Sequence, residues 1–401
     1  MSKKTFDEVV LFARTGLNPR TNFKLGIGDN KYITIKNIHD NEIIIDENTD
    51  VVDDAAIALI HKRSQIKKGD ILFCSIGRMG DMYIIQEEPE GWDINESVFA
   101  FTVDTSIVRQ KYFYYIFKNR DTIEYLIKNS SGSTFKSIKM NQLKKMVFDL
   151  PSLSEQDTIV AILDTLSLII QKREDELKKL DNLIKARFVE LFGNPSINPY
   201  GFLSIPVQEA IESGYIEKPL DGNHGNKHPK SSEYVEEGIP FVMANDLVNG
   251  RVDFKKCAKL TKERADQLDK GFAHDGDVLI THKGTIGRTA ILHTDLDYVM
   301  LTPQVTYYRP LKGILAEYLK GYFDSEYFQH KMKQLAEAGG STRAYVGITN
   351  QTQLSLLIPD LDRQKEFVEF IKQVDKSKVV IQKSLDEAQL LFDSLMQLYF
   401  S

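Results

Sequence analysis

The sequence predicts an α+β fold built by tandem duplication, in which two α/β domains alternate with two long helices that form an antiparallel coiled coil. The first observation is an internal repeat: a shift of 208 positions brings residues 132–156 onto 340–364 without a gap, matching Gly-Ser-Thr, Pro, Leu and Gln. The second is that a long heptad pattern follows each copy. Two similar domains that alternate with paired helices also predict pseudo-two-fold symmetry.

Each long helix carries apolar residues spaced alternately by three and four positions, a pattern broken at Arg173 and Arg187 in the first helix and at Lys378 in the second. In the first helix these are Ile159, Leu163, Leu166, Ile170, Leu177, Leu180, Ile184 and Leu191. In the second they are Phe367, Ile371, Val374, Ile381, Leu385, Ala388, Phe392, Leu395 and Tyr399. A 3.5-residue repeat is typical of a coiled-coil seam, and two such seams in one chain have each other as partners. A helix over 154–191 would be roughly 50 Å long.

The repeat divides the chain into four segments. We expect a first domain over residues 1–150, a spacer helix over 151–193, a second domain over 194–358 and a second spacer helix over 359–401. The motif Gly-Asp-Ile-Leu at 69–72 returns as Gly-Asp-Val-Leu at 276–279, one position off the helix repeat, as an insertion in a loop would produce.

Alternation of β-branched and aromatic residues locates the strands of both domains. In the first domain we expect strands at 31–38, 42–46, 69–76, 82–85, 97–103 and 147–151, and helices at 5–13, 107–129 and 140–145. In the second we expect strands at 239–247, 277–281, 289–293, 299–308 and 354–359, helices at 313–338 and 349–353, and the second long helix over 362–400. Residues 221–230, rich in Gly, Asn and His, occur in the second copy alone and predict a flexible loop.

Composition favours a cytoplasmic protein with two full cores. The 401 residues are 42% hydrophobic, and no apolar run is long enough to cross a membrane. Cys74 and Cys257 are the two cysteines, too few for a disulfide framework or a zinc cluster. The net charge of −6 argues mildly against binding nucleic acid, but 125–148 holds five lysines and no acid. Such a local positive face can still meet phosphates.

Basic and amide side chains on glycine-rich turns are the candidate DNA contacts, because they can reach phosphates or base edges. The candidates of the first copy are Lys36, Arg78, Ser133, Thr134, Lys136 and Lys139. Those of the second copy are Asn245, His282, Lys283, Arg288, Ser341, Thr342, Arg343 and Tyr345. The alternative is that these segments are ordinary turns and turn caps.

Catalytic and metal sites find little support in the sequence. No GxxxxGK[ST] phosphate loop occurs, and Gly26 and Gly28 lack the third glycine of a dinucleotide-binding loop. His224, His228 and Asp221 would suit a metal ion, but the Gly- and Asn-rich context favours a loop without one. We therefore expect no catalytic residue, no bound cofactor and no metal in this chain.

The duplicated plan resembles the specificity subunit of type I restriction–modification enzymes. The segment Leu150-Pro151-Ser152-Leu153-Ser154-Glu155-Gln156 is similar to that family's entry into its conserved helix. The second copy departs from the pattern, with Arg363 in place of the acid. The resemblance covers nearly the whole chain. It implies that each globular domain is a target recognition domain that reads one half of a split double-stranded DNA sequence, and that the helices set the gap between the halves.

The resemblance also implies partners. Two methyltransferase subunits would dock on the helices, followed by two restriction–translocase subunits, and S-adenosylmethionine, ATP and Mg would bind to those partners. A spacer of 50 Å would span on the order of fifteen base pairs. Two alternatives stay open: a specificity subunit of a type II system with a fused methyltransferase–nuclease, and a coiled-coil scaffold without a DNA role.

Overall fold

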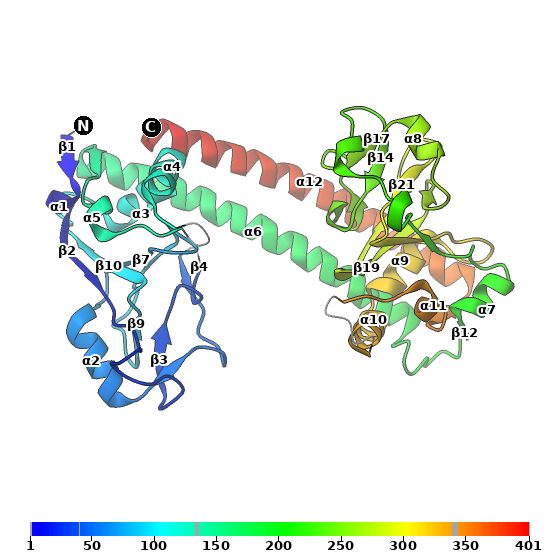
Figure 1. Cartoon of the computed structure of the whole chain (residues 1–401), viewed down its shortest axis with the longest axis horizontal. Coiled ribbons are helices and arrows are strands. Elements are labelled where there is room, and N and C mark those ends of the chain that lie inside the picture. Colours follow the sequence, from blue (N-terminus) through cyan, green and yellow to red (C-terminus); the bar gives the residue numbers. More distant parts are fainter. Residues whose placement is uncertain (1, 40, 133–135, 339–343, 401) are drawn as a thin grey trace. The chain divides into compact units, whose positions relative to one another are not determined.

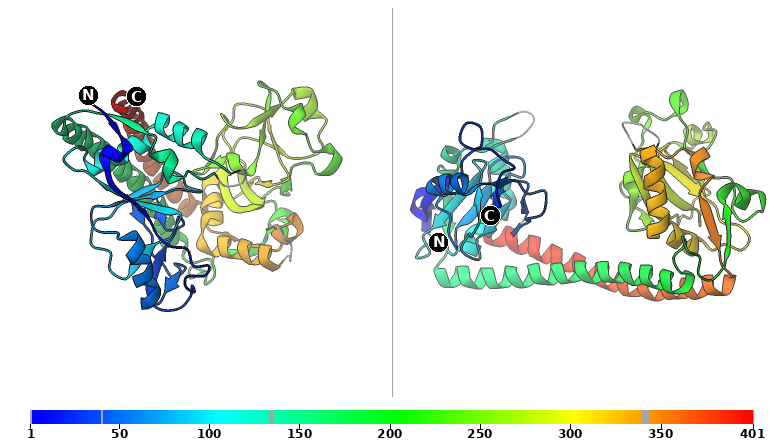
Figure 2. Two further views of the ribbon diagram at one scale, coloured as in Figure 1. Left: turned by 60° about the vertical axis from the view of Figure 1, so that its left-hand side comes forward. Right: turned by 90° about the horizontal axis from the view of Figure 1, so that it is seen from below.

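The computed structural model describes residues 2–39, 41–132, 136–338 and 344–400. The chain forms two compact units: the first combines Met1–Arg173 with Ser384–Ser401, and the second is Glu174–Lys383. Each unit therefore contains part of each long helix. These helices, α6 (Leu153–Phe192) and α12 (Leu361–Phe400), have 40 residues each, and Figure 2 draws each as one unbroken helix.

The first unit combines a four-stranded antiparallel sheet with short helices (Figure 1). Its strands are β1 (Ser2–Thr5), β2 (Val10–Thr15), β3 (Asn30–Ile33), β4 (Ile38–His39), β5 (Glu42–Ile43), β6 (Val51–Val52), β7 (Ile71–Cys74), β8 (Met82–Ile84), β9 (Trp92–Ile94), β10 (Val98–Val103) and β11 (Val147–Leu150). Its helices, besides its part of the long pair, are α1 (Phe6–Val9), α2 (Asp54–Ser64), α3 (Gln110–Lys118), α4 (Arg120–Asn129) and α5 (Met140–Leu143). The main sheet has the order β2-β10-β7-β8.

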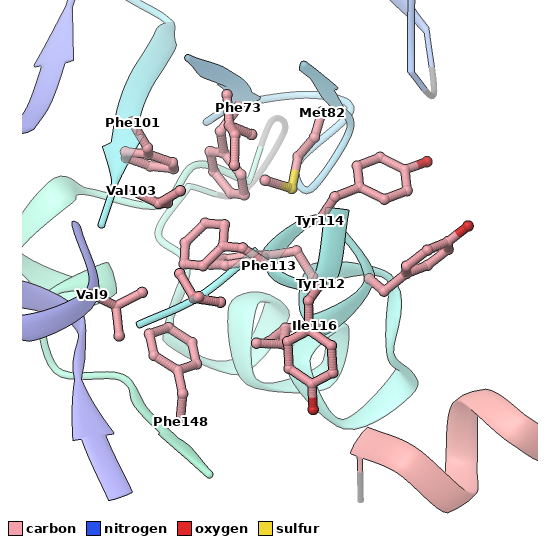
Figure 3. Close-up of a cluster of buried hydrophobic side chains, with 14 of the residues drawn as sticks. Val9, Phe73, Met82, Phe101, Val103, Tyr112, Phe113, Tyr114, Ile116 and Phe148 are labelled. Atoms are coloured by element: carbon pink, nitrogen blue, oxygen red, sulfur yellow. The ribbon is translucent and has the colours of Figure 1, made fainter. Parts of the chain in front are cut away.

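The main core of the first unit lies between this sheet and α3. Figure 3 shows Phe73 and Phe101 from the sheet pointing toward Phe113 of α3 and Phe148 of β11. Phe101 and Phe113 meet edge to face with ring centroids 6.3 Å apart, a favourable arrangement for aromatic rings. Burial of these large side chains holds the sheet against the helix.

The second unit repeats this plan with different side chains. Its strands are β12 (Leu203–Pro206), β13 (Leu220–Asp221), β14 (Ile239–Val242), β15 (Leu247–Val248), β16 (Arg251–Val252), β17 (Ala258–Leu260), β18 (Phe272–Ala273), β19 (Val278–Lys283), β20 (Thr285–Ile291), β21 (Val299–Leu301), β22 (Val305–Tyr308) and β23 (Ser355–Ile358). Its helices, besides its part of the long pair, are α7 (Val207–Glu212), α8 (Lys262–Asp266), α9 (Ala316–Asp324), α10 (Glu326–Ala338) and α11 (Ile348–Gln351), with 3₁₀ turns η1 (Gly225–Lys227), η2 (Ser231–Glu233) and η3 (Ala244–Asp246). The main sheet, β13-β22-β19-β20, matches the order β2-β10-β7-β8.

Two glycines show how closely the backbones of the two units correspond. A Cβ atom on Gly16 would lie 1.7 Å from the carbonyl oxygen of Ile94, and one on Gly222 would lie 1.8 Å from that of Leu301. Each glycine follows the first strand of its main sheet, and each carbonyl belongs to the strand paired in parallel with β3 or β14. The same close backbone approach therefore occurs in both copies, where no other residue fits.

The long helices pair within each unit, as the seams predict. In the first unit Ile159 and Leu163 of α6 share a core cluster with Met396 of α12. In the second, Phe188 and Phe192 of α6 pack on Phe367 of α12, with centroids 5.6 Å away in both cases. The start of α6 thus pairs with the end of α12, and the end of α6 with the start of α12. This pairing is antiparallel, which confirms the predicted fold class.

The expected helix over residues 5–13 is wrong beyond Val9. The chain leaves α1 after one turn and continues as β2, which pairs with β10 so that Phe12 opposes Thr102. The run Val-Leu-Phe-Ala-Arg-Thr is rich in strand-forming residues, and the open edge of a sheet gives its backbone the partners that a longer helix would have supplied.

The expected continuous helices over 107–129 and 313–338 are each two helices. Asn119 ends α3 in an extended conformation, and its side chain accepts a hydrogen bond from the Asp121 N–H at 2.8 Å to begin α4. Ser325 separates α9 from α10 in the same way, accepting from the Phe328 N–H at 3.3 Å. Residues that cap a new helix thus interrupt an unbroken apolar pattern. The helix α2 was not expected from the sequence.

The described residues include no helix that is both long and apolar enough to cross a membrane.

Candidate nucleic-acid interface

The site is built on one turn of the main sheet in each unit. Gly77 lies three residues after the end of β7, and Gly284 directly follows β19; both have positive φ. The Gly77 N–H donates to the Lys136 carbonyl at 3.4 Å, and the Gly284 N–H donates to the Ala344 carbonyl at 2.9 Å. The turn is thereby tied to the segment before α5 or α11. This brings the candidates at 77–80 and 136–139 together in the first unit, and those at 282–285 and 345 together in the second.

At this turn in the first unit, Arg78 meets His39 beside the backbone of Lys36. The Lys36 carbonyl lies 2.8 Å from His39 Nε2, and the Arg78 guanidinium donates to the same imidazole. Lys36 and Arg78 are exposed, while His39 is half-buried between them. A chain of contacts therefore links two residues that lie 42 positions apart in the sequence. His39 was not among the candidates, since no local pattern marks a lone histidine as part of such a cluster.

Lys136 and Lys139 extend the same surface. Both side chains are exposed. The Lys139 backbone N–H donates to Gln142 Oε1 at 2.7 Å at the start of α5, which fixes the backbone and leaves the ammonium group facing solvent. Lysines on an exposed, tethered backbone can contact phosphates without reorganising the fold.

In the second unit, Lys283 and Tyr345 stand side by side on two paired backbone segments. The Lys283 ammonium lies 5.9 Å from the centroid of the Tyr345 ring, within the range of a cation–π contact. His282 requires a correction: it is 0% exposed, and its Nδ1 contacts the Val346 carbonyl at 3.0 Å. Burial lowers the pKa of its imidazole, so His282 belongs to the interior and does not present itself to DNA.

Arg288 and Asn245 lie away from this pair. Arg288 lines a cavity of about 900 Å³, together with residues of the long helices such as Lys185 and Lys378. Asn245 is exposed on η3, at the position that Lys36 occupies in the first unit. In both units the next residue is the turn cap: Asn37 accepts from the Thr34 N–H at 2.9 Å, and Asp246 accepts from the Met243 N–H at 2.7 Å.

The Gly-Ser-Thr candidates Ser133, Thr134, Ser341, Thr342 and Arg343 lie outside the described residues. The segments on either side of them are described. Ser131 and Ser137 pair across the first of these loops, with each N–H donating to the other's carbonyl at 2.9 Å.

The seam candidates divide into buried and half-buried positions. Leu163, Leu166 and Val374 are buried. Half-buried positions are Ile170, Leu177, Leu180, Ile184, Ile371, Ile381, Leu385 and Phe392. Ile184, Ile371 and Phe392 also pack on the domain cores. Lys378, which interrupts the seam, forms an ion pair with Asp181 across the two helices.

Reactive and metal-binding groups are scarce in the part of the chain that the structure describes. No group of three or more His, Cys, Asp or Glu side chains there could hold a metal ion. Cys74 and Cys257 are buried, and burial raises the pKa of the Cys74 thiol to about 12. A thiol with that pKa carries almost no thiolate at neutral pH, so it is no nucleophile.

Comparison with known proteins relates both copies of the repeat to one protein family. A family model described as the type I restriction modification DNA specificity domain matches residues 2–179 and 220–389. The chain is 21% identical to the type I restriction enzyme EcoBI specificity subunit of Escherichia coli over 76% of this chain and 67% of that protein. It is 30% identical to the MjaIX specificity subunit of Methanocaldococcus jannaschii over 36% of this chain and 35% of that protein.

A crystal structure is similar over almost the full length. It is the specificity subunit of a type I restriction–modification system from M. genitalium, with 14% identity and a TM-score of 0.53. The match covers 98% of this chain and 94% of the other. At this identity the likeness concerns the fold.

Proposed function

The chain belongs to the type I restriction modification DNA specificity family, and on that premise we propose that each of its globular domains reads one half of a two-part DNA target. The chain is a DNA specificity subunit of a type I system. The finer assignment makes 1–150 one target recognition domain and 194–358 the other. The helices at 151–193 and 359–401 are then the spacers that set the gap between the half-sites.

One observation carries this assignment: both units present polar or basic side chains at the same place on the same backbone. The Gly77 turn brings Lys36, Arg78 and Lys136 together, and the Gly284 turn presents Lys283 beside Tyr345. Two like surfaces on a duplicated chain suit duplex DNA, whose backbone has the same two-fold symmetry. Phosphate contacts would position each domain, and the side chains that differ between the copies would choose the bases.

The chain itself is a non-catalytic subunit in this proposal and works in the cytoplasm. Two methyltransferase subunits and two restriction–translocase subunits would supply the chemistry. S-adenosylmethionine, ATP and Mg would bind to those partners. This division of labour agrees with the burial of both cysteine thiols, Cys74 and Cys257.

An apolar groove on the helix pair of the first unit is where we place a methyltransferase subunit. The groove has a volume of about 740 Å³, and its apolar lining is Ala161, Ile162, Leu166, Leu391 and Leu395. Ile162 is 37% exposed and Leu391 is 50% exposed, and neither side chain belongs to the hydrophobic core cluster of the first unit. Contiguous apolar side chains on a surface are typical of a protein–protein contact.

Substitutions in the groove test this placement. Ile162→Glu combined with Leu391→Glu should prevent a methyltransferase subunit from binding here, because a carboxylate cannot be buried in an apolar contact without a partner. Light scattering of the purified complex should then show a smaller mass. Leu390→Glu, at an exposed position of α12 outside the groove, is the control and should leave the mass unchanged. Assembly of the double variant at full mass would contradict the placement.

The reader function is tested by a methylation map. The chain is co-expressed with its methyltransferase in a host without methylation, and the modified bases are sequenced. We expect a split motif with a fixed unread gap that disappears when this chain is omitted. Unchanged methylation without the chain, together with no binding to duplex DNA in a titration, would favour the scaffold alternative.

The DNA-facing surface is tested by charge reversal. Arg78→Glu with Lys136→Glu should weaken duplex binding, and log Kd should depend less steeply on log salt because fewer counterions are released. Lys172→Glu, on an exposed face of α6, is the control and should leave both quantities near wild type. Equal effects of the two changes would mean that general charge alone governs binding.

A further inference from the structure

A buried carboxylate organises one wall of the second domain close to the proposed DNA surface. Asp221, the last residue of β13, is 2% exposed. His224 Nε2 lies 2.6 Å from Asp221 Oδ2, and the Lys270 ammonium donates to Asp221 Oδ1. His282 Nε2 lies 3.8 Å from the same carboxylate and has no hydrogen-bond partner among the described residues, although the atom is buried.

Three of these groups, Asp221, His224 and Lys270, border a polar cavity of about 440 Å³. Tyr345, Thr349 and Asn350 also line it. Tyr345 also packs against Lys283, so the cavity adjoins the surface that the proposed function assigns to DNA. The cavity lies beside the end of β19 and the start of α11, which Figure 1 labels.

The arrangement leaves hydrogen-bond donors facing the cavity. A buried carboxylate is costly unless it is paired, and Asp221 meets that cost by holding His224 and Lys270. Their side chains remain 46% and 31% exposed, so the Lys270 ammonium can donate to a further group, while the His224 ring, whose Nε2–H is used on Asp221, offers Nδ1 as an acceptor. The amide of Asn350 and the hydroxyls of Tyr345 and Thr349 add donors. A ligand of this cavity would therefore carry oxygen or nitrogen acceptors.

The first unit shows that the fold does not require this cluster. The sheet registers align Leu72, Ala100 and Arg14 in one unit with Leu279, Tyr307 and Leu220 in the other. Asp221 therefore corresponds to Thr15, and His282 corresponds to Ser75.

Both small hydroxyls satisfy the backbone locally: Thr15 donates to the Glu96 carbonyl and Ser75 to the Ser97 carbonyl, each at 2.8 Å. Ser137 takes the place of Tyr345, since it pairs with Ile76 as Tyr345 pairs with Lys283. One backbone thus carries three small hydroxyls in one copy and an acid, an imidazole and a phenol in the other. Side chains that vary on a shared backbone next to the DNA surface are suited to setting specificity.

We propose that this cavity is a recognition subsite of the second domain, in which Asp221 positions the Lys270 ammonium to donate to an acceptor group of the second DNA half-site and orients the His224 ring beside it. The inference rests on the proposed function. The acceptor is either the O6 and N7 edge of a guanine or a backbone phosphate, since both offer the acceptors that these donors require. Asp221 is a positioning residue that acts through the other two.

The test combines the methylation map with duplex titration for Asp221→Asn, His224→Gln and Lys270→Gln. If the acceptor is a base, the variants relax one position of the second half-site, with discrimination there falling roughly tenfold to a hundredfold, while the first half-site stays unchanged. If it is a phosphate, the motif is kept, affinity for all sequences falls together, and the salt slope of Lys270→Gln decreases by about one.

Lys227→Gln is the matched control. Lys227 lies in the same loop and pairs with Asp269, but it does not line the cavity. It should leave the motif, the affinity and the salt slope at wild-type values. Because Asp221 is buried, its variant could unfold the domain, and the two partly exposed variants then decide the matter.

The proposal is overturned if His224→Gln and Lys270→Gln both keep the wild-type motif and affinity while the wild-type chain still directs a split motif. That result would leave the proposed function standing. If the wild-type chain directs no split motif and binds no duplex, the proposed function fails first. The two failures are therefore distinguishable.

Discussion

The two units of this chain differ in side chains far more than in backbone. Both have the same order of strands in the main sheet, the same close approach at Gly16 and Gly222, and the same tether from the turn glycine to the following segment. At equivalent positions near the proposed DNA surface, the first unit has Thr15, Ser75 and Ser137, and the second unit has Asp221, His282 and Tyr345. The backbone is therefore the shared support, and the chemistry at its surface changes from copy to copy.

The helix pair shows a second difference between the copies. The groove of the first unit is apolar, whereas two of the five equivalent positions of the second unit, 208 residues away, carry charged side chains, Glu369 and Arg187. Leu395 corresponds to Arg187, which pairs with Glu366 and Glu190 and lies 5.7 Å from the Phe370 ring. The two ends of the helix pair therefore offer a partner different surfaces, even though the heptad pattern is common to both.

The largest expected effect tests whether the shared backbone is required in both copies. Gly16→Ala and Gly222→Ala would each drive a Cβ atom into a backbone carbonyl, at 1.7 and 1.8 Å. We expect each to lower the free energy of unfolding by about 4 kcal/mol, measured by chemical denaturation. Gly201→Ala is the control: no described atom lies within 4 Å of its added Cβ, so only the cost of its positive φ, about 1 kcal/mol, applies.

A buried glutamine at the start of each long helix makes matching contacts in the two copies. Gln156 accepts from the Arg109 N–H and donates to the Ile107 and Pro151 carbonyls. Gln364 makes the same three bonds with Leu315, Gly313 and Pro359. Replacing either glutamine by Leu leaves the backbone N–H and carbonyl groups that it bonds without partners. We expect this to lower the free energy of unfolding by about 3 kcal/mol in either copy.

Thermal unfolding of Gln156→Leu and Gln364→Leu provides the measurement. Gln373→Leu, at an exposed position of α12, serves as the control and should change stability little. A large effect in only one copy would show that the two helix entries are not equivalent.

The seam should be weaker in its middle than at its ends. Leu163 is 0% exposed within a core cluster, so Leu163→Ala should cost about 2.5 kcal/mol. Leu180 is half-buried, and Leu180→Ala should cost about 1 kcal/mol because less apolar surface returns to water. Urea denaturation of the two variants decides this, and equal losses would contradict the difference in burial.

The smallest expected effect is a pH dependence of stability caused by His282, whose counterpart in the first unit is Ser75. Burial lowers the pKa of His282 below 6.5 in the folded chain, with Asp221 opposing this shift and His224 and Lys283 adding to it. Below the ordinary pKa the unfolded chain binds a proton that the native chain does not, so stability is lost as pH falls below about 6.5. His282→Asn, which can keep a donor toward the Val346 carbonyl, should reduce this loss between pH 7 and pH 5. Identical pH profiles for the two proteins would refute this origin of the effect.

The periodic pattern of apolar residues was sufficient to predict the two long helices from the sequence. The long helices begin and end within one or two residues of the predicted positions, since the heptads, Pro151 and Gly193 mark them directly. The break at Asn119 was missed because apolar spacing continues across it, and only the capping geometry reveals the new helix. The extent of α1 was overestimated because the strand that replaces it depends on a partner, β10, about ninety residues further along the chain.

The duplication, the two domains and the antiparallel helix pair can be predicted from the sequence alone, because repeats and heptads are patterns that the residue order shows directly. Tertiary structure decided which candidate side chains reach the surface. Lys36 and Arg78 meet at His39, and Asp221 gathers His224 and Lys270, across tens of residues of chain. His282 looks like a surface residue in the sequence and is buried in the fold. Burial and pairing of this kind depend on how strands are registered, and that information is shared among distant segments.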